Sequence, residues 1–372
     1  MLENPVFDAL FKPFQCKSLN LPNRLVMAPM TRSHSPNGIL GPDMAPYYAR
    51  RAAANVGLII SEATGIARPG SLNDLDVPRF YGEAELAAWK TAVDAVHASG
   101  GQFVPQLWHV GAMRAAAHAR RVDDALLESP SGLDAKGQLR NKPMTDSDIA
   151  DTIAAYADAA ANAKKMGCDG VEIHGAHGYL IDQFFWPLSN RREDQWGGNT
   201  LLERSRFAVE ILKAVRASVG EDFAVILRVS QWKQQDYEAR LAETPQELDA
   251  WLNLLSDAGV DIFHLSQRRF WEAEFAGSEL NLAGWAKKLT GKPTITVGSV
   301  GLNGDFLSSF SGGGADQAAN LDQLATRLEK GEFDLVAVGR ALLQDPAWAT
   351  KLKESRSDEM SSFNAASMLT VF

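Results

Sequence analysis

The segment Val171-Glu-Ile-His-Gly-Ala-His-Gly-Tyr-Leu-Ile-Asp-Gln-Phe184 carries the clearest structural signal in the chain. Its first residues alternate between apolar and polar side chains and follow the turn-like Gly167-Cys-Asp-Gly170, a pattern that predicts a short buried strand. Two histidines and a tyrosine stand where that strand ends: His174, His177 and Tyr179. Such side chains are costly to bury unless something binds them, and parallel α/β proteins bind ligands at the carboxyl ends of their strands. The stretch therefore predicts a parallel strand with a ligand site at its end.

The composition is that of a soluble globular protein. The chain has 372 residues, of which 45% are apolar and 22% charged, enough for one large α/β barrel or two ordinary domains. The net charge of −9 argues against nucleic-acid binding, which needs a basic stripe. Two cysteines give no disulfide framework, and neither a signal peptide nor a membrane-spanning run is apparent. We therefore expect a cytoplasmic protein without nucleic-acid or membrane partners; its oligomeric state is not indicated.

Short apolar runs alternate with amphipathic stretches along the whole chain. Eight strands are expected at Arg24–Met30, Gly57–Glu62, Gln102–Leu107, Gly170–His174, Ala224–Val229, Asp261–Leu265, Thr294–Gly298 and Asp334–Gly339. Eight helices are expected at Met44–Ala54, Glu83–Ser99, Ser147–Met166, Leu201–Val219, Pro245–Ala258, Leu282–Leu289, Leu321–Lys330 and Pro346–Lys353. This alternation predicts an α/β fold, the (β/α)8 TIM barrel. The alternative is a doubly wound open sheet, which is disfavoured because no Gly-x-Gly-x-x-Gly follows the first strand.

No linker or repeat divides the chain, so we expect one domain over residues 1–372. Three connections are longer than a barrel needs, after strands three, six and seven: Arg114–Lys142, Gln267–Gly277 and Gly301–Asn320. Because all three follow strands, they are expected on the catalytic face, where long loops usually shape a substrate pocket.

Hydrogen-bond donors stand at the ends of several predicted strands: Thr31, Gln106, Arg228 and Arg340. Gly298-Ser299 and Gly339 follow strands seven and eight, where TIM barrels commonly bind phosphate. A glycine lets the backbone approach a phosphate, and a guanidinium forks onto its oxygens. Taken alone, Gly339-Arg340 would be an ordinary strand end with a surface arginine, and its place at strand eight favours the phosphate site.

Eight longer motifs occur in a recognisable order: Asn23-Arg-Leu-Val-Met-Ala-Pro-Met-Thr31, Tyr47-Tyr-Ala-Arg-Arg51, Gly57-Leu-Ile-Ile-Ser-Glu-Ala63, Gln106-Leu-Trp-His-Val-Gly111, His174-Gly-Ala-His-Gly-Tyr-Leu-Ile-Asp-Gln-Phe184, Asn190-Arg-Arg192, Trp196-Gly-Gly198 and Val338-Gly-Arg340. Each is weak alone, but in this order and spacing they resemble the old yellow enzyme family, the FMN-dependent ene reductases. The resemblance runs from Leu10–Pro13 to Gln344–Pro346. It implies an NAD(P)H-dependent flavin oxidoreductase with FMN as cofactor and NADPH or NADH as reductant.

The resemblance also implies which residues hold FMN. Thr31, with Ala28, Pro29 and Met30 before it, would lie at the flavin and donate to its O4. Gln106 would hold the pyrimidine edge, Arg228 would lie near N1 and O2, where negative charge develops when the ring accepts hydride, and Ala63 would pack under the ring. The phosphate cradle would consist of Gly298, Ser299, Gly339 and Arg340.

The same resemblance implies the reduction of activated C=C bonds in α,β-unsaturated carbonyl or nitro compounds by a ping-pong hydride and proton mechanism. His174 and His177 would grip the carbonyl oxygen, so that the β-carbon accepts hydride. Tyr179 would donate a proton to the α-carbon, and Trp108 would wall the substrate pocket.

Other interpretations remain open at this point. His-x-x-His spacing also suits zinc, but a third ligand is needed and Glu172 is expected on the other face of the strand, so we expect no metal. His97 is expected to be a core histidine. The alternative functions are a non-catalytic flavin-binding sensor and a non-flavin, phosphate-binding barrel lyase or isomerase, and the latter lacks a strand-end lysine for a Schiff base.

Two further stretches bear on the site. Ser355–Phe372 lacks the pattern that the family places beside the flavin, which leaves open what covers the dimethylbenzene end of the ring. Arg50 and Arg51 are expected to form a solvated helix edge.

Overall fold

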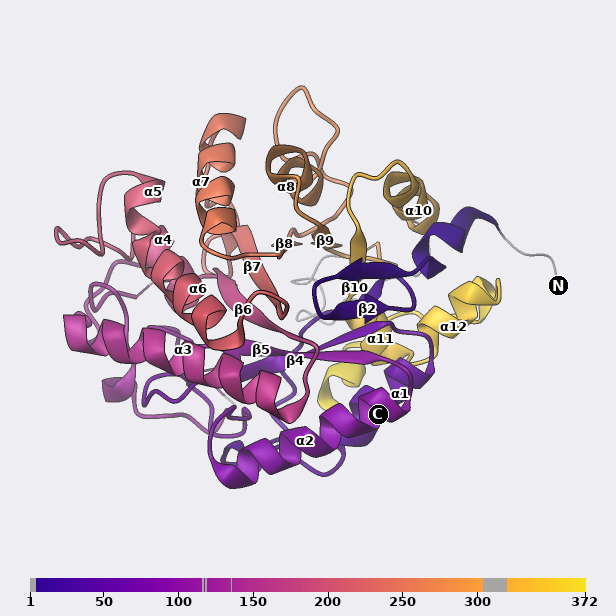
Figure 1. Ribbon diagram of the computed structural model, residues 1–372, viewed down its shortest axis with the longest axis horizontal. Helices are drawn as coiled ribbons and strands as arrows, with labels where there is room; N and C mark the ends of the chain where they lie inside the picture. Colours follow the sequence, from indigo (N-terminus) through magenta and orange to yellow (C-terminus); the bar gives the residue numbers. More distant parts are fainter. Residues whose placement is uncertain (1–4, 116, 118, 135, 304–319) are drawn as a thin grey trace.

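The computed structural model describes residues 5–115, 117, 119–134, 136–303 and 320–372. Its centre is a closed barrel of parallel strands in the order β10-β3-β4-β5-β6-β7-β8-β9 (Figure 1). The strands are β3 (Leu25–Met27), β4 (Leu58–Gly65), β5 (Gln102–Trp108), β6 (Gly170–His177), β7 (Ala224–Lys233), β8 (Ile262–Ser266), β9 (Thr294–Val297) and β10 (Leu335–Val338). The barrel prediction is confirmed and the open sheet was wrong, because β10 pairs with β3 and closes the ring.

Helices surround the strands and bury their apolar faces against them (Figure 1). They are α1 (Met44–Ala53), α2 (Glu83–Ala98), α3 (Asp146–Met166), α4 (Leu180–Phe185), α5 (Leu201–Arg204), α6 (Arg206–Val219), α7 (Pro245–Asp257), α8 (Leu282–Thr290), α10 (Leu321–Glu329), α11 (Arg340–Gln344) and α12 (Trp348–Lys353). Reciprocal capping boxes that begin with Thr145, Thr200 and Thr244 start α3, α5 and α7. No helix in these described ranges is long and apolar enough to cross a membrane.

A short antiparallel hairpin covers the amino-terminal end of the barrel. It consists of β1 (Phe14–Cys16) and β2 (Leu19–Leu21), which the sequence patterns did not predict. Phe14, Leu19 and Leu21 pack in one cluster with apolar side chains of the barrel strands, such as Val26 and Leu58. Since the hairpin closes this end, the barrel is accessible to a ligand from the other.

On several strands, an apolar side chain inside the barrel is followed two residues later by a polar one. Side chains two residues apart on a strand share a face. The apolar residue of each such pair belongs to the same interior cluster, and the polar residue is also buried: Val104 and Gln106 on β5, Ile226 and Arg228 on β7, Ile262 and His264 on β8. The apolar floor therefore gives way to buried polar groups at the carboxyl ends of the strands.

The side chain of Asn23 forms hydrogen bonds with the backbone at the starts of the neighbouring strands β3 and β4. Its Oδ1 accepts hydrogen bonds from the backbone N–H groups of Leu25 (3.0 Å) and Gly57 (3.1 Å), and its Nδ2 donates to the carbonyl of Asn55 (3.0 Å). A Cβ on Gly57 would lie only 2.8 Å from Asn23 Oδ1, so this approach requires glycine.

We predict that Asn23→Ala lowers the free energy of unfolding by about 2 kcal/mol, because the buried backbone N–H of Leu25 loses its side-chain acceptor, whereas that of Gly57 keeps its bond to the carbonyl of Leu25. Urea unfolding followed by circular dichroism measures the change. Asn20→Ala is the control, since the side chain of Asn20 is exposed; its effect should stay within about 0.5 kcal/mol. Equal midpoints for wild type and Asn23→Ala would show that these contacts do not stabilise the barrel.

Candidate functional site

The residues predicted for the site come from strands all around the barrel, and the structure brings them to one rim. Because the carboxyl ends of parallel strands in a closed barrel meet at the same end, residues that are distant in sequence become neighbours there. They lie in or follow seven strands: Ala28, Pro29, Met30 and Thr31 after β3; Ala63 in β4; Gln106 and Trp108 in β5; His174 and His177 in β6, with Tyr179 just beyond; Arg228 in β7; Gly298 and Ser299 after β9; and Gly339 and Arg340 after β10.

The aromatic side chains expected to contact substrate form one cluster. The ring centroids of His174 and His177 are 5.2 Å apart, and those of His174 and Tyr179 are 4.9 Å apart. Trp108 meets Tyr179 edge to face at 4.9 Å. Two imidazoles, a phenol and an indole wall thus lie within reach of one small molecule.

An irregularity at the end of β6 makes this cluster possible. Residues 174 and 177 are an odd number apart, so regular alternation would place them on opposite faces. The pairing of β6 with β7 shifts between Gly175 and His177, and His177 adopts a left-handed backbone with φ of 65°. Such a conformation is costly for a side chain larger than glycine and is concentrated at functional sites.

A buried ion pair supports the turn that follows His177. Lys233 Nζ lies 2.9 Å from Asp182 Oδ1, both side chains are fully buried, and Asp182 Oδ2 accepts from Gly178 N at 2.7 Å. The prediction that no lysine stands at a strand end was wrong, because β7 runs on to Lys233. This amine is nevertheless occupied by Asp182 and by the carbonyl of Gln231 (2.7 Å).

Both histidines of the cluster are neutral donors at neutral pH. Burial first, and the positive charge of Arg228 second, lower the pKa of His174 and of His177 well below the usual value. Nδ1 of His174 accepts from Ala176 N at 3.3 Å, so its proton resides on Nε2. His177 Nε2 lies 2.7 Å from Ser266 Oγ. A neutral imidazole retains one N–H group, which is what a carbonyl oxygen requires.

Tyr179 is held as a protonated phenol. Burial raises its pKa, opposed in part by the Gln234 amide, whose Nε2 donates to the phenol oxygen at 3.1 Å. Since this oxygen already accepts a hydrogen bond, its own proton is free to be donated elsewhere.

Two arginines supply positive charge at the rim. Arg228 is 7% exposed, burial lowers its pKa, and its buried Nε has no hydrogen-bond partner among the described residues. Nη2 of Arg340 lies 3.3 Å from Ser299 Oγ, and its guanidinium lies over the ring of Phe363 at 5.6 Å. A buried cation and an arginine–serine pair at separate strand ends fit the two electron-rich parts of FMN, the pyrimidine edge and the phosphate.

The structure corrects the expected place of Glu172. Residues 172 and 174 share a face, and Glu172 is fully buried inside the barrel, where Oε1 accepts from Gln106 Nε2 (2.7 Å) and Oε2 from His264 Nδ1 (2.6 Å). No group of three potential metal ligands occurs among the described residues. His264 was not predicted as a site residue, although a lone histidine among the apolar residues 262–265 was a signal for it.

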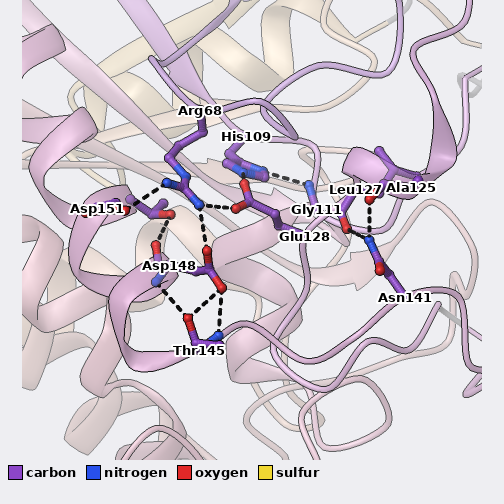
Figure 2. A network of polar contacts seen from close by, with 11 residues as sticks. Arg68, His109, Gly111, Ala125, Leu127, Glu128, Asn141, Thr145, Asp148 and Asp151 are labelled. Carbon is purple, nitrogen blue, oxygen red and sulfur yellow. Dashed lines mark hydrogen bonds and ion pairs between the residues drawn. The ribbon is translucent and has the colours of Figure 1, made fainter.

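A polar network anchors the long loop after β5 (Figure 2). His109 is fully buried; its Nδ1 accepts from Gly111 N at 3.0 Å and its Nε2 lies 2.8 Å from Glu128 Oε2. Arg68 binds Glu128 and, at 3.1 Å, Asp148 at the start of α3. The carbonyl of His109 also accepts a hydrogen bond from the backbone N–H of Leu180, the first residue of α4. The network therefore holds in place the segments that carry Trp108 and Tyr179, which precede His109 and Leu180 in the chain.

His97 was predicted in the core, but it is exposed, with its Nε2 2.7 Å from Asp169 Oδ2.

The other two long loops were expected after β8 and after β9. Residues 267–281 follow β8 as expected, whereas residues 304–319 of the Gly301–Asn320 connection lie outside the described residues.

The C-terminal stretch returns to the rim. Arg32, next to Thr31, donates to the carbonyl of Thr370 at 2.7 Å, and Arg51 donates to that of Phe372 at 2.9 Å. Arg51 is therefore fully buried, and the prediction of a solvated edge was wrong for it. In the same stretch, Phe363 lies against Arg340 of the predicted phosphate cradle.

Comparisons with known proteins agree with this geometry. A family model described as the NADH:flavin oxidoreductase / NADH oxidase family matches residues 9–359. Similar proteins include 12-oxophytodienoate reductase 7 of Oryza sativa subsp. japonica (32% identical, 91% of this chain and 86% of that protein) and NADPH dehydrogenase of Clostridium acetobutylicum (32%, 91% and 92%).

Solved structures with the same fold include a morphinone reductase in complex with tetrahydroNAD (TM-score 0.78, 28% identical, 96% of this chain and 93% of that chain). An old yellow enzyme homologue from Zymomonas mobilis is equally similar (TM-score 0.78, 26% identical, 97% and 96%).

The buried histidines predict a loss of stability in mild acid. Burial lowers the pKa of His109, His174, His177 and His264. Their contribution to stability is complete above the unfolded value of about 6.5 and is lost as the pH falls below it, because the unfolded chain then binds protons that the folded protein does not. Four such groups give up to about 5 kcal/mol per pH unit.

Chemical unfolding between pH 7.5 and pH 5.5 measures this slope. His109→Gln should reduce the slope, whereas His34→Gln should leave it unchanged because His34 is exposed. A free energy of unfolding that stays constant over this range would contradict the neutral state of the buried rings.

Proposed function

Because this chain belongs to the NADH:flavin oxidoreductase / NADH oxidase family, the old yellow enzyme family, we propose that it reduces the activated C=C bond of α,β-unsaturated carbonyl or nitro compounds. It is an FMN-dependent oxidoreductase with NADPH or NADH as the reductant. The observation that carries the finer proposal is the cluster of two neutral imidazoles and one protonated phenol, with ring centroids 4.9 to 5.2 Å apart at the rim.

Bound FMN supplies hydride transfer, from the nicotinamide and then to the substrate's β-carbon. The residues proposed to hold its ring are Ala28, Pro29, Met30, Thr31, Ala63, Gln106 and Arg228. Those proposed to hold its phosphate are Gly298, Ser299, Gly339 and Arg340. Arg228 places positive charge where negative charge develops, in a buried environment that strengthens the interaction.

His174 and His177 bind the substrate's carbonyl or nitro oxygen through their N–H groups. Charge builds up on that oxygen during the reaction, so two fixed donors stabilise the transition state more than the ground state. The left-handed backbone of His177 and its contact with Ser266 fix the second ring before substrate arrives.

Tyr179 donates a proton to the α-carbon. Its raised pKa keeps the proton in place until an enolate-like carbanion forms, and the amide of Gln234 stabilises the phenolate that remains. Trp108 packs against Tyr179 and excludes water from that side of the pocket. Nicotinamide and substrate occupy this pocket in turn, which is a ping-pong cycle.

The alternative functions have weaker support. A sensor without turnover would leave an acid and two oxyanion donors without a role. A Schiff-base lyase would need a free amine, and Lys233 is buried against Asp182. The names of the relatives also favour reduction, since those from Oryza sativa and the morphinone enzyme are called reductases.

We predict that Tyr179→Phe separates the two half-reactions. Reduction of bound FMN by NADPH or NADH should stay within about threefold of wild type, because the phenol transfers no proton in that step, whereas oxidation by an enone should slow by about 100-fold or more. Anaerobic stopped-flow absorbance measures each step separately. Tyr81→Phe provides the control, since the ring of Tyr81 lies against the Arg79 guanidinium (6.0 Å) just before α2. Equal losses in both steps would count against Tyr179 as the acid.

We further predict that Arg340→Met weakens FMN binding about 10- to 100-fold, the usual cost of a charge-assisted hydrogen bond. Quenching of flavin fluorescence on titration into FMN-free protein measures the dissociation constant. Arg356→Met is the matched control, because Arg356 pairs with Glu354 and Glu359 on the surface. Wild-type affinity in Arg340→Met would place the phosphate elsewhere.

A further inference from the structure

A row of three buried side chains lies inside the barrel below the rim. Gln106 is 2% exposed, and Glu172 and His264 are not exposed at all. Glu172 accepts from Gln106 at 2.7 Å and from His264 at 2.6 Å, so each carboxylate oxygen has one donor. The reaction proposed above uses Gln106 only, which leaves a buried acid and a buried base without a function.

The carboxylate determines how both of its neighbours are oriented. A carboxylate can only accept hydrogen bonds, so Nδ1 of His264 must carry a hydrogen and Gln106 must turn its NH2 group towards Glu172. The amide oxygen of Gln106 then faces away from Glu172 and is available to the N–H group of a pyrimidine edge. Without Glu172, the two orientations of the amide would compete.

The carboxylate of Glu172 also balances the positive charge of Arg228. Arg228 pairs in register with both His174 and His264, lies buried among them, and interacts electrostatically with Glu172. Burial lowers the pKa of His264, and in the part of the chain that the structure describes its buried Nε2 has no hydrogen-bond partner, as expected for the bare nitrogen of a neutral ring. Arg228 and Glu172 together therefore carry no net charge, in a place where charges are weakly screened.

We propose that Glu172 and His264 are positioning residues for the cofactor: they orient the Gln106 amide towards FMN and cancel the charge of Arg228, and so set how readily FMN is reduced. This inference rests on the proposed FMN site at the strand ends. His264 holds Glu172 in place and, being neutral, leaves its charge intact.

Substitutions at position 172 separate the two effects. Glu172→Gln removes the charge but retains an acceptor for Gln106, because the His264 ring can take up the other tautomer and accept from the new amide. Glu172→Leu removes both. Loss of the negative charge favours reduced FMN, so both variants should raise its reduction potential by about 30 mV or more, which corresponds to a tenfold change for two electrons. Only Glu172→Leu should also weaken the binding of oxidised FMN, by about tenfold.

Potentials are measured against a reference dye, and dissociation constants by flavin fluorescence. The control is Asp261→Asn, which removes a buried carboxylate that pairs with Arg216 just before the start of β8; its potential should equal that of wild type. A Glu172→Gln protein with bound FMN and wild-type potential would overturn the proposal.

His264→Phe is the alternative test variant if the Glu172→Gln protein does not fold. It removes one of the two donors to the carboxylate, so the amide of Gln106 should be less fixed and oxidised FMN should bind about tenfold more weakly. Wild-type affinity and potential in this variant overturn the proposal. A different result, wild-type protein that fails to bind FMN, would instead contradict the proposed function, so the two failures are distinguishable.

Discussion

The pairing of β10 with β3 is the interaction on which the rest of the structure depends. It aligns Val336 with Leu25 and Val338 with Met27 and turns an open sheet into a ring. Closure leaves no strand edge exposed and places the first and last strands of the barrel side by side. For that reason Arg340, which comes just after β10, lies next to the strand that precedes Thr31, although the two residues are far apart in the sequence. The site exists only because the ring is closed.

The barrel interior combines two environments that have opposite requirements. Its lower part is filled by apolar side chains and covered by the β1–β2 hairpin. Nearer the carboxyl ends of the strands, the side chains of Gln106, Glu172, His264 and Arg228 are buried together. They are tolerable there because they satisfy one another, and their weak screening makes each of them effective towards a ligand. Stability and chemistry thus come from adjacent levels of the same strands.

The sequence predicted most of the fold because each strand and helix carries its own local pattern. All eight barrel strands occur close to where they were expected, and His174, His177 and Tyr179 gather as predicted. The errors arose where the outcome depends on distant partners. Strands β1 and β2 have only three residues each, too few for a pattern. Arg51 resembles a surface residue until the C-terminal stretch covers it. Glu172 was predicted on the wrong face of its strand, although residues 172 and 174 share a face. The role of His264 depends on its contact with Glu172, 92 positions away.

The backbone of His177 restricts how this site can diversify. Few residues tolerate a positive φ, and branched side chains tolerate it least. Asparagine is among the few that do, and its amide still presents an N–H group from a shorter side chain. A lineage of such proteins can therefore exchange imidazole for amide at this position without rebuilding the turn, and gain room for bulkier substrates while keeping a grip on the oxygen.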